Sequence, residues 1–349
     1  MFPNNTSVTV AIVGCGGFIG SHLMNAILCR TKWRIFGVDT DCYRIQQYLQ
    51  NERVEFFCSD LSAPGVVQRI AQFPIVVNLA AICTPSRYMS QAVTVIRSNY
   101  DYPALLAEAC QKSGSWLIHF STSEVYGKTP ADSGPLKEDE TPLIFGPVQS
   151  SRWSYATAKL LTERFVAGLE NLRWTMVRPF NFVGPYMDFM PGVDGEGIPR
   201  GLANFSTALL KGEPIKLVNG GCARRSFTSV FDAMDFLFDV FASPEKAFYQ
   251  TFNVGNPENE VTIAELAEKM RRIYAQLRGV SLASIPEPCS IDGEAYYGVG
   301  YDDSLRRLPD VEKAERLLGF KASTPLDVVL RESLSWFVDH YGAGTEMRV

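Results

Sequence analysis

Short runs of β-branched and aromatic residues alternate with longer amphipathic segments through the first half of this 349-residue chain. A parallel sheet requires such alternation, because a helix must carry the chain back to the start of each new strand. The runs with the length and composition of strands are residues 8–13, 34–38, 54–57, 75–78, 116–120 and 175–177. The sequence therefore predicts an α/β fold built on a doubly wound parallel sheet.

The composition excludes several classes of protein. Hydrophobic residues make up 46% of the chain and aromatic residues 12%, which excludes a mainly disordered protein. Acidic residues (38) outnumber basic ones (33) and no basic run occurs, so we expect no nucleic-acid partner. No apolar stretch has membrane-spanning length, and the N-terminus lacks the features of a signal peptide. The eight cysteines are scattered and the three histidines are far apart, so we expect free thiols, no metal site and a cytoplasmic enzyme.

The texture of the chain changes after the sixth run, which predicts a second, smaller domain. Residues 178–200 carry four prolines and several glycines, a composition typical of an ordered loop beside a site. Residues 1–178 are therefore assigned to a dinucleotide-binding domain, with a returning segment at about 226–254. Residues 179–349 are assigned mainly to a substrate-binding domain.

Two segments of the second half have distinct patterns. Residues 262–277 are amphipathic at helical spacing, with Thr262 as the expected N-cap and Glu265 as its capping-box partner. Residues 281–310 are rich in proline, glycine and tyrosine and are predicted as loop.

A glycine-rich turn, Gly14-Cys-Gly-Gly17-Phe-Ile-Gly20, follows the first predicted strand and opens a helix. Glycines let the backbone turn sharply and approach a pyrophosphate, which the helix N-terminus then stabilises. Asp39 ends the next strand, where a carboxylate binds the ribose hydroxyls and repels a 2′-phosphate, so NAD is favoured over NADP. The further candidate cofactor contacts are Phe18, Ile19, Asp60, Leu61, Leu79, Ala80, Ala81 and Asn99.

Tyr155 and Lys159 lie four residues apart in a helical segment and so share one face. A neighbouring lysine lowers the pKa of a phenol, and the phenolate can then take a proton from a sugar hydroxyl. The segment FSTSEVYG (120–127) leaves a strand and places hydroxyls and one carboxylate at the sheet edge where α/β sites form. The YxxxK spacing alone is equally compatible with an exposed helix pair, and the upstream segment is what favours a catalytic base.

The glycine turn, NLAA (78–81), STSEVYG, YxxxK and RPFN (178–181) occur in the order found in the extended short-chain dehydrogenase/reductases, which this chain resembles. It is most similar to the members acting on nucleotide sugars, namely the UDP-glucuronic acid decarboxylases and the plant UDP-apiose/UDP-xylose synthases. The segments that carry this similarity are 78–85, 117–128, 152–159, 178–200, 209–221, 252–262 and 296–304. The resemblance implies a Rossmann-like fold, bound NAD, UDP-glucuronic acid as substrate, and a homodimer formed through helices at about 101–112 and 154–169.

The resemblance also assigns roles to single positions. Tyr155 and Lys159 are the base and its partner, and Thr122 assists at the C4 hydroxyl. Oxidation at C4 gives a β-keto acid, which loses carbon dioxide readily because an enolate is left behind. Ser123, Glu124 and Arg152 match residues around the sugar carboxylate and C5, and Arg307 matches the arginine credited with the carboxylate or with C5 protonation. The positions that match UDP contacts are Asn181, Arg200, Lys216, Arg225 and Tyr301.

One departure bears on the product. Ser123 stands where dehydratases have an aspartate, so elimination of water is not expected. The plant synthases share Cys83 but carry a second cysteine at the position of Ser123, which favours UDP-xylose over UDP-apiose, the product that needs ring contraction. Cys83 is equally compatible with a small buried apolar residue.

Two other functions stay open. A 4-epimerase, or another decarboxylase of this family acting on a different nucleotide sugar, is the first. A catalytically silent NAD-binding protein is the second, and the intact Tyr155, Lys159 and Glu124 argue against it.

Overall fold

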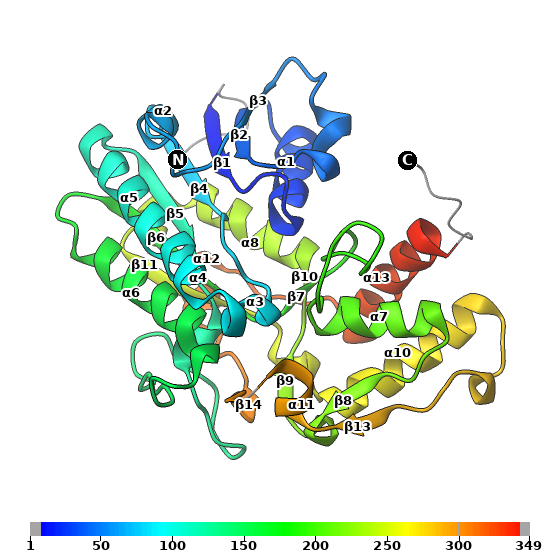
Figure 1. Cartoon of the computed structure of the whole chain (residues 1–349). Helices are drawn as coiled ribbons and strands as arrows, with labels where there is room; N and C mark the ends of the chain where they lie inside the picture. The colour runs from blue at the N-terminus through cyan, green and yellow to red at the C-terminus, as the bar shows by residue number, and fades with distance from the viewer. Residues whose placement is uncertain (1–7, 299, 343–349) are drawn as a thin grey trace.

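A seven-stranded sheet forms the centre of the computed structural model, which describes residues 8–298 and 300–342. All neighbouring strands in it are parallel. Their order across the sheet is β3 (Val54–Cys58), β2 (Arg34–Asp39), β1 (Thr9–Val13), β4 (Ile75–Asn78), β5 (Trp116–Phe120), β6 (Arg173–Pro179) and β11 (Gln250–Val254). The order runs outward from β1 in both directions, so the predicted doubly wound sheet is confirmed (Figure 1).

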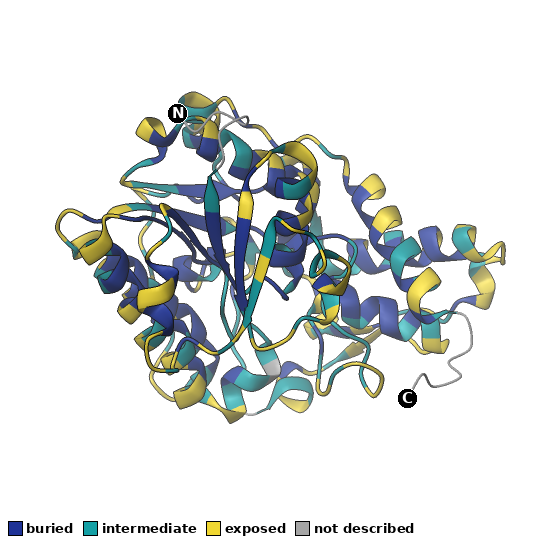
Figure 2. Cartoon of the chain, turned by 90° about the horizontal axis from the view of Figure 1, so that it is seen from above, coloured by how far each residue is buried: buried dark blue, intermediate teal, exposed yellow. Residues whose placement is uncertain are grey.

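Helices cover both faces of the sheet, and alternate residues of each strand explain why. In β1, Val10 and Ile12 belong to the core that contains α1 (Phe18–Arg30) and α8 (Val230–Ala242). Ala11 and Val13 belong to a second core, on the opposite face. The helices of that second core are α2 (Val66–Ile70), α5 (Asp101–Ser113) and α6 (Ser154–Gly168). Apart from the edge strand β3, whose residues are half-buried or exposed, the strands are accordingly buried along most of their length (Figure 2).

The rest of the chain builds a smaller unit beside the sheet. Its larger helices are α7 (Gly201–Lys211), α10 (Ile263–Arg278) and α13 (Leu326–Tyr341). Its three small sheets pair β12 (Glu260–Thr262), β9 (Arg224–Ser226) and β14 (Arg306–Arg307), then β8 (Lys216–Val218) with β13 (Cys289–Ile291), and β7 (Phe182–Val183) with β10 (Thr228–Ser229). The first core continues from the sheet into α7, α10 and α13, so the two parts share one apolar interior.

The remaining elements are short. They are α3 (Pro85–Ser90), α4 (Ala92–Asn99), α9 (Pro244–Ala247), α11 (Gly293–Tyr297) and α12 (Glu312–Leu318), with 3₁₀ turns η1 (Tyr43–Tyr48), η2 (Ser123–Tyr126), η3 (Ser151–Trp153), η4 (Asn219–Gly221), η5 (Pro257–Asn259) and η6 (Leu282–Ser284). The prediction of loop over 281–310 is wrong for β13, α11 and β14, because strands of two or three residues are too short to show a periodic pattern. None of the described helices combines the length and the apolarity that a bilayer-spanning segment needs.

The predicted capping box is present at the start of α10. The Thr262 hydroxyl accepts a hydrogen bond from the Glu265 N–H at 3.0 Å, and the Glu265 carboxylate accepts one from the Thr262 N–H at 2.7 Å. We expect Thr262→Ala to lower the free energy of unfolding by about 1 kcal/mol, because one of these bonds is lost at an exposed helix end. Urea denaturation measures the change, and Thr262→Ser, which keeps the hydroxyl, should stay close to the parent protein.

Candidate active site

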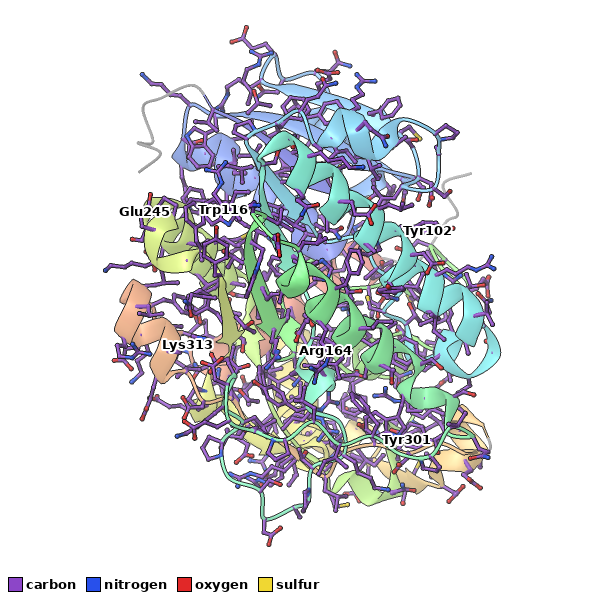
Figure 3. The ribbon with its side chains drawn as sticks, turned by 90° about the vertical axis from the view of Figure 1, so that its left-hand side faces the viewer. Tyr102, Trp116, Arg164, Glu245, Tyr301 and Lys313 are labelled. Atoms are coloured by element: carbon purple, nitrogen blue, oxygen red, sulfur yellow. The ribbon has the colours of Figure 1, made fainter. Side chains whose placement is uncertain are left out.

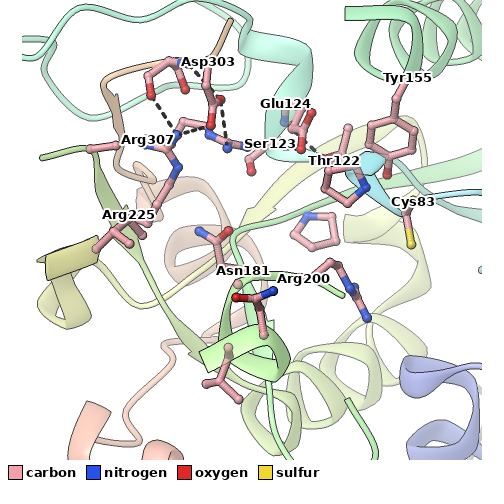
Figure 4. A pocket seen from close by; sticks show the side chains of 18 of the residues that line it. Cys83, Thr122, Ser123, Glu124, Tyr155, Asn181, Arg200, Arg225, Asp303 and Arg307 are labelled. Carbon is pink, nitrogen blue, oxygen red and sulfur yellow. Dashed lines mark hydrogen bonds and ion pairs between the residues drawn. The ribbon is translucent and has the colours of Figure 1, made fainter. Parts of the chain in front are cut away.

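A cavity of about 590 Å³ opens at the C-terminal edge of the sheet, facing the smaller unit. The sheet side contributes Leu79 after β4, Phe120 at the end of β5, and Tyr155 and Lys159 of α6. The opposite wall comes from α7, β8, β9, α11 and β14. Figure 4 shows side chains from both walls pointing into this cavity. Ligand sites in doubly wound folds lie at this edge.

The glycine turn between β1 and α1 fits a dinucleotide. Gly14 has φ +83°, and a Cβ there would lie 2.8 Å from the backbone nitrogen of Ala80. A Cβ at Gly20 would overlap the carbonyl oxygen of Gly14. Gly17 is the N-cap of α1 and no side chain caps that helix end. The turn thus packs so closely against the backbone that side chains at Gly14 and Gly20 have no room. The first N–H groups of α1 are left for an anion such as a pyrophosphate.

Asp39 joins the end of β2 to the glycine turn. Its carboxylate accepts hydrogen bonds from the N–H groups of Gly16 at 2.8 Å, Thr40 at 2.7 Å and Asp41 at 3.2 Å. Burial raises the pKa of Asp39, and these backbone bonds oppose that rise. The group is therefore fixed beside the glycine turn, with lone pairs remaining for ribose hydroxyls.

The other predicted cofactor contacts divide into two sets. Phe18, Ile19, Leu79 and Ala81 line the cavity, and Ala80 packs against Gly14. Three others are placed differently, because their side chains serve the fold. The Asp60 carboxylate accepts from the Ser62 N–H, Leu61 is buried in the second core, and the Asn99 amide donates to the carbonyls of Ile82 and Val95.

Tyr155 and Lys159 lie side by side on the first turns of α6, and both are buried. Lys159 Nζ donates to the Phe120 carbonyl at 2.9 Å, and burial lowers the pKa of Lys159 to about 8. The Tyr155 ring stacks on Tyr88, with centroids 4.9 Å apart and planes at 5°. Thr122 hydrogen-bonds the Tyr155 hydroxyl.

The expectation that Lys159 lowers the pKa of Tyr155 is not met in this structure. Burial raises that pKa well above its ordinary value, and Cys83 and Glu124 raise it further. The hydrogen bond from Thr122 and the charge of Arg200 act in the opposite direction. One N–H of the Lys159 ammonium donates to the Phe120 carbonyl, and Lys159 is not among the main groups that change the pKa of Tyr155.

Three buried arginines, Arg152, Arg225 and Arg307, and two half-buried carboxylates, Glu124 and Asp303, form a charge cluster in the cavity that Tyr155 also lines. Figure 4 shows Arg225, Arg307, Asp303 and Glu124 of this cluster. Arg152 donates to Glu124 at 2.5 Å and lies 3.6 Å from Asp303, and Arg225 pairs with Asp303 at 2.9 Å. Arg307 makes only longer contacts, 3.7 Å to Glu124 and 3.5 Å to Asp303, and its buried Nε has no partner. Three guanidinium groups against two carboxylates leave one net positive charge, which suits one incoming anion.

The pKa values in the cluster reflect this crowding. Burial alone would raise the pKa of Asp303, yet Arg225, Arg307 and Arg152 hold it well below its usual range. Burial, and then the charge of Arg307, lowers the pKa of Arg225 to about 10. Glu124 and Asp303 more than offset the burial of Arg152 and raise its pKa.

Cys83 and Ser123 also line the cavity. Cys83 packs in a small apolar cluster with Tyr88 and Tyr155, and Ser123 is buried at the start of η2. Both are thus placed next to Tyr155 and Thr122.

The five positions matched to UDP contacts all line the same cavity. Asn181, with φ +41°, donates from its amide to the Ser226 carbonyl. Lys216 Nζ lies 5.9 Å from the centroid of the Tyr296 ring, and Tyr301 stacks on Tyr297 at 4.8 Å. This wall offers cations and aromatic faces to a nucleotide.

Two cavity residues were missed by the sequence reasoning. Tyr88 lies under the Tyr155 ring, and Asp303 neutralises part of the arginine cluster. Tyr88 lies outside the segments that carry the resemblance, whereas Asp303 lies within the segment 296–304, four residues before Arg307, and was given no role there. Within the described residues no group of three histidine, cysteine, aspartate or glutamate side chains is placed to hold a metal ion.

Comparison of this chain with known proteins identifies its family. The model of the "NAD dependent epimerase/dehydratase family" matches residues 10–255. The UDP-D-apiose/UDP-D-xylose synthase of Oryza sativa subsp. japonica is 41% identical over 94% of this chain and 89% of its own length. UDP-D-apiose/UDP-D-xylose synthase 1 of Arabidopsis thaliana is 40% identical over 94% and 91%. The crystal structure of PbgP3 protein from Burkholderia pseudomallei superposes with a TM-score of 0.84 and 30% identity, over 96% of this chain and 97% of that one. The chain therefore belongs to the NAD dependent epimerase/dehydratase family, with NAD as its cofactor.

Proposed function

We propose that this chain converts UDP-glucuronic acid through a UDP-4-keto intermediate to UDP-xylose, and that residue 123 decides whether UDP-apiose forms as well. The observation that carries the proposal is the buried cluster of Arg152, Arg225 and Arg307 with its one net positive charge. It lines the same cavity as Tyr155, so a sugar with a carboxylate at C6 held by the cluster could present its C4 hydroxyl to the phenol. The names of the two plant relatives support the same reaction.

The residues divide the work at the sugar ring. When bound, NAD would supply the hydride acceptor for oxidation at C4 and the hydride for the final reduction. Tyr155 takes the proton of the C4 hydroxyl, with Thr122 hydrogen-bonded to its phenol, and Lys159 holds the end of β5 that faces the ring. Arg307 and Arg152 hold the C6 carboxylate beside the new ketone.

Decarboxylation then needs positioning more than strong acid. The C5–C6 bond breaks, carbon dioxide leaves, and the electron pair enters an enolate whose oxygen faces Tyr155 and Thr122. C5 takes a proton from the side of Glu124 and Arg307, which restores the ketone for the final reduction. Arg152, Arg225 and Arg307 are buried, which limits the access of bulk water to this intermediate.

The test is to incubate the purified protein with UDP-glucuronic acid and NAD and to follow the products by proton NMR. We expect loss of carbon dioxide and a UDP-pentose, with UDP-xylose as the main product. Unchanged UDP-glucuronic acid, or UDP-galacturonic acid as its only product, would contradict a decarboxylase and support an epimerase or another nucleotide sugar.

Ser123→Cys is expected to raise the share of branched-chain product. The change supplies the second cysteine that the resemblance places opposite Cys83, and both side chains line the cavity. We expect the ratio of UDP-apiose to UDP-xylose to rise about tenfold in the NMR assay, which corresponds to about 1.4 kcal/mol between two competing barriers. Ser123→Ala is the control for loss of the hydroxyl, and an equal ratio in both variants would contradict a role for the thiol.

We also propose a homodimer formed through α5 and α6, joined by α4. These helices lie side by side on one face, where Tyr102 and Arg164 are seen (Figure 3). The exposed apolar side chains on these helices are Val93, Ile96, Leu105 and Leu161. Such a patch is typical of an interface. We expect Leu105→Glu with Leu161→Glu to halve the mass measured by light scattering, whereas Val280→Glu, at an exposed site after α10, should not change it.

We propose a reducing, cytoplasmic compartment for the protein. All eight cysteines are free, and four of them are exposed. Free exposed thiols persist where glutathione keeps them reduced. Cell fractionation with a specific antibody tests this location.

A further inference from the structure

A turn at residues 185–188 is held by two side chains from the dinucleotide-binding part of the chain. Arg44, in η1 between β2 and β3, donates to the carbonyl of Tyr186 at 3.2 Å and to the carbonyl of Asp188 at 2.5 Å. His22 of α1 donates from Nε2 to the carbonyl of Pro185 at 2.9 Å. Three carbonyls of one short turn are thus fixed from outside the turn.

The backbone of this turn needs that support. Tyr186 has φ +63° and Asp188 has φ +65°, a left-handed conformation that non-glycine residues adopt rarely. Such a conformation persists only where neighbouring groups hold it. The two carbonyls that Arg44 binds belong to these two residues.

The 185–188 turn also fixes Arg200, an arginine that lines the cavity. The Asp188 carboxylate accepts from the backbone N–H of Arg200 at 2.6 Å and from its Nε at 3.2 Å. Arg200 lines the cavity, and its guanidinium carbon lies 6.0 Å from the centroid of the Phe18 ring, at the start of α1. Arg200 therefore lies between α1 and the cavity wall of the smaller unit. Its bonds to Asp188 use the backbone N–H and Nε, which leaves the Nη atoms for a ligand.

We propose that Arg44 is a positioning residue that sets Arg200, through the 185–188 turn and Asp188, against the diphosphate of the bound nucleotide sugar. The proposal rests on the proposed function only for the class of ligand, a uridine diphosphate sugar. Arg44 does not line the cavity, and neither do Tyr186 and Asp188, the two residues that it binds. Arg44 thus connects the dinucleotide-binding part of the chain with the residues proposed to bind the substrate diphosphate.

The experiment measures binding of UDP by calorimetry to the NAD-loaded protein and to five variants. We expect Arg44→Met to weaken UDP binding about tenfold, and Arg200→Met about a hundredfold, because a charge-assisted bond to phosphate is lost. The double variant Arg44→Met/Arg200→Met should bind no more weakly than Arg200→Met, since Arg44 acts only through Arg200. Arg34→Met is the matched control, because Arg34 is an exposed arginine of β2 that also binds one carbonyl, that of Glu52.

Three readouts separate positioning from damage to the fold. NAD content and the midpoint of thermal unfolding should match those of Arg34→Met, and Arg44→Lys, which keeps one donor, should recover part of the affinity. Additive losses in the double variant, loss of NAD from Arg44→Met, or UDP binding equal to that of the parent protein would overturn the proposal. So would a parent protein that does not bind UDP.

UDP binding and turnover fail independently. If the cycle is non-additive but UDP-glucuronic acid is not turned over, the proposed function falls and the role of Arg44 stands. If turnover occurs but Arg44→Met binds UDP normally, the role of Arg44 falls and the proposed function stands.

Discussion

Tyr155→Phe should lower kcat for UDP-glucuronic acid by about a thousandfold and leave KM nearly unchanged. The variant removes the one hydroxyl placed to take the C4 proton, and a positioned acid–base group contributes about 10²–10⁴-fold. The ring itself stays stacked on Tyr88, so the pocket keeps its shape. Initial rates of carbon dioxide release at saturating substrate measure the effect. Tyr249→Phe, at an exposed tyrosine away from the cavity, is the control and should retain full activity.

The pH profile of kcat provides a second check on Tyr155. Burial raises the pKa of its phenol, so the reactive phenolate becomes more abundant as pH rises through neutrality. Burial lowers the pKa of Lys159 to about 8, so its side chain is a charged ammonium below that pH and a neutral amine above it. We expect activity to rise with pH and to decline beyond about 8 as Lys159 loses its proton. Residual activity of Tyr155→Phe that kept the rising limb would contradict the assignment of Tyr155 as the base.

Arg307→Met is expected to weaken binding of UDP-glucuronic acid about a hundredfold and to leave binding of UDP-glucose almost unchanged. Arg307 has the longest ion-pair contacts in the cluster and a buried Nε without a partner, so it has the most unused capacity for an anion. Its loss also reduces the net charge of the cluster from one to zero. Truncating one partner of a buried charge pair costs about 2–5 kcal/mol of binding free energy. A hundredfold loss of affinity lies at the lower end of that range. Calorimetry with both nucleotide sugars measures the difference, because only one of them carries a carboxylate.

Arg152→Met provides the contrast. Arg152 is itself buried and is paired at 2.5 Å with Glu124, and its removal leaves two half-buried carboxylates, Glu124 and Asp303, short of a partner. We expect the free energy of unfolding to fall by roughly 3–5 kcal/mol. Arg307→Met, which breaks only long contacts, should cost far less stability. Equal weakening of UDP-glucose and UDP-glucuronic acid by Arg307→Met would contradict a carboxylate site.

The sheet could be predicted from the sequence because its strands are buried on both faces. Val10 to Val13 form one apolar run, and that run is followed by the 13-residue helix α1. Local rules were also sufficient for the capping box at Thr262 and for the glycine turn at Gly14, where a side chain has no room. These features depend on neighbours in the sequence, so the sequence shows them.

The electrostatics of the site depend on distant neighbours and could not be predicted in the same way. Arg307 lies on a strand of two residues, β14, and reaches Glu124 only because β14 pairs with β9. Asp303 has no motif, and the raised pKa of Tyr155 comes from burial that no spacing of residues reveals. Asn99 and Leu61 stay predictions as cofactor contacts, because position along the chain does not show where a side chain points: the Asn99 amide donates to the Ile82 carbonyl, and Leu61 lies in the second core.

The late position of β14 in the chain has a consequence for biosynthesis. Ribosomes deliver the glycine turn, Asp39 and Tyr155 well before Asp303 and Arg307, and N-terminal regions fold first as a chain emerges. The segments of the dinucleotide cradle are therefore synthesised while the charged pocket still lacks two of its members. The pocket for a sugar acid is completed only when residue 307 has left the ribosome, so it is among the last parts of the molecule to form.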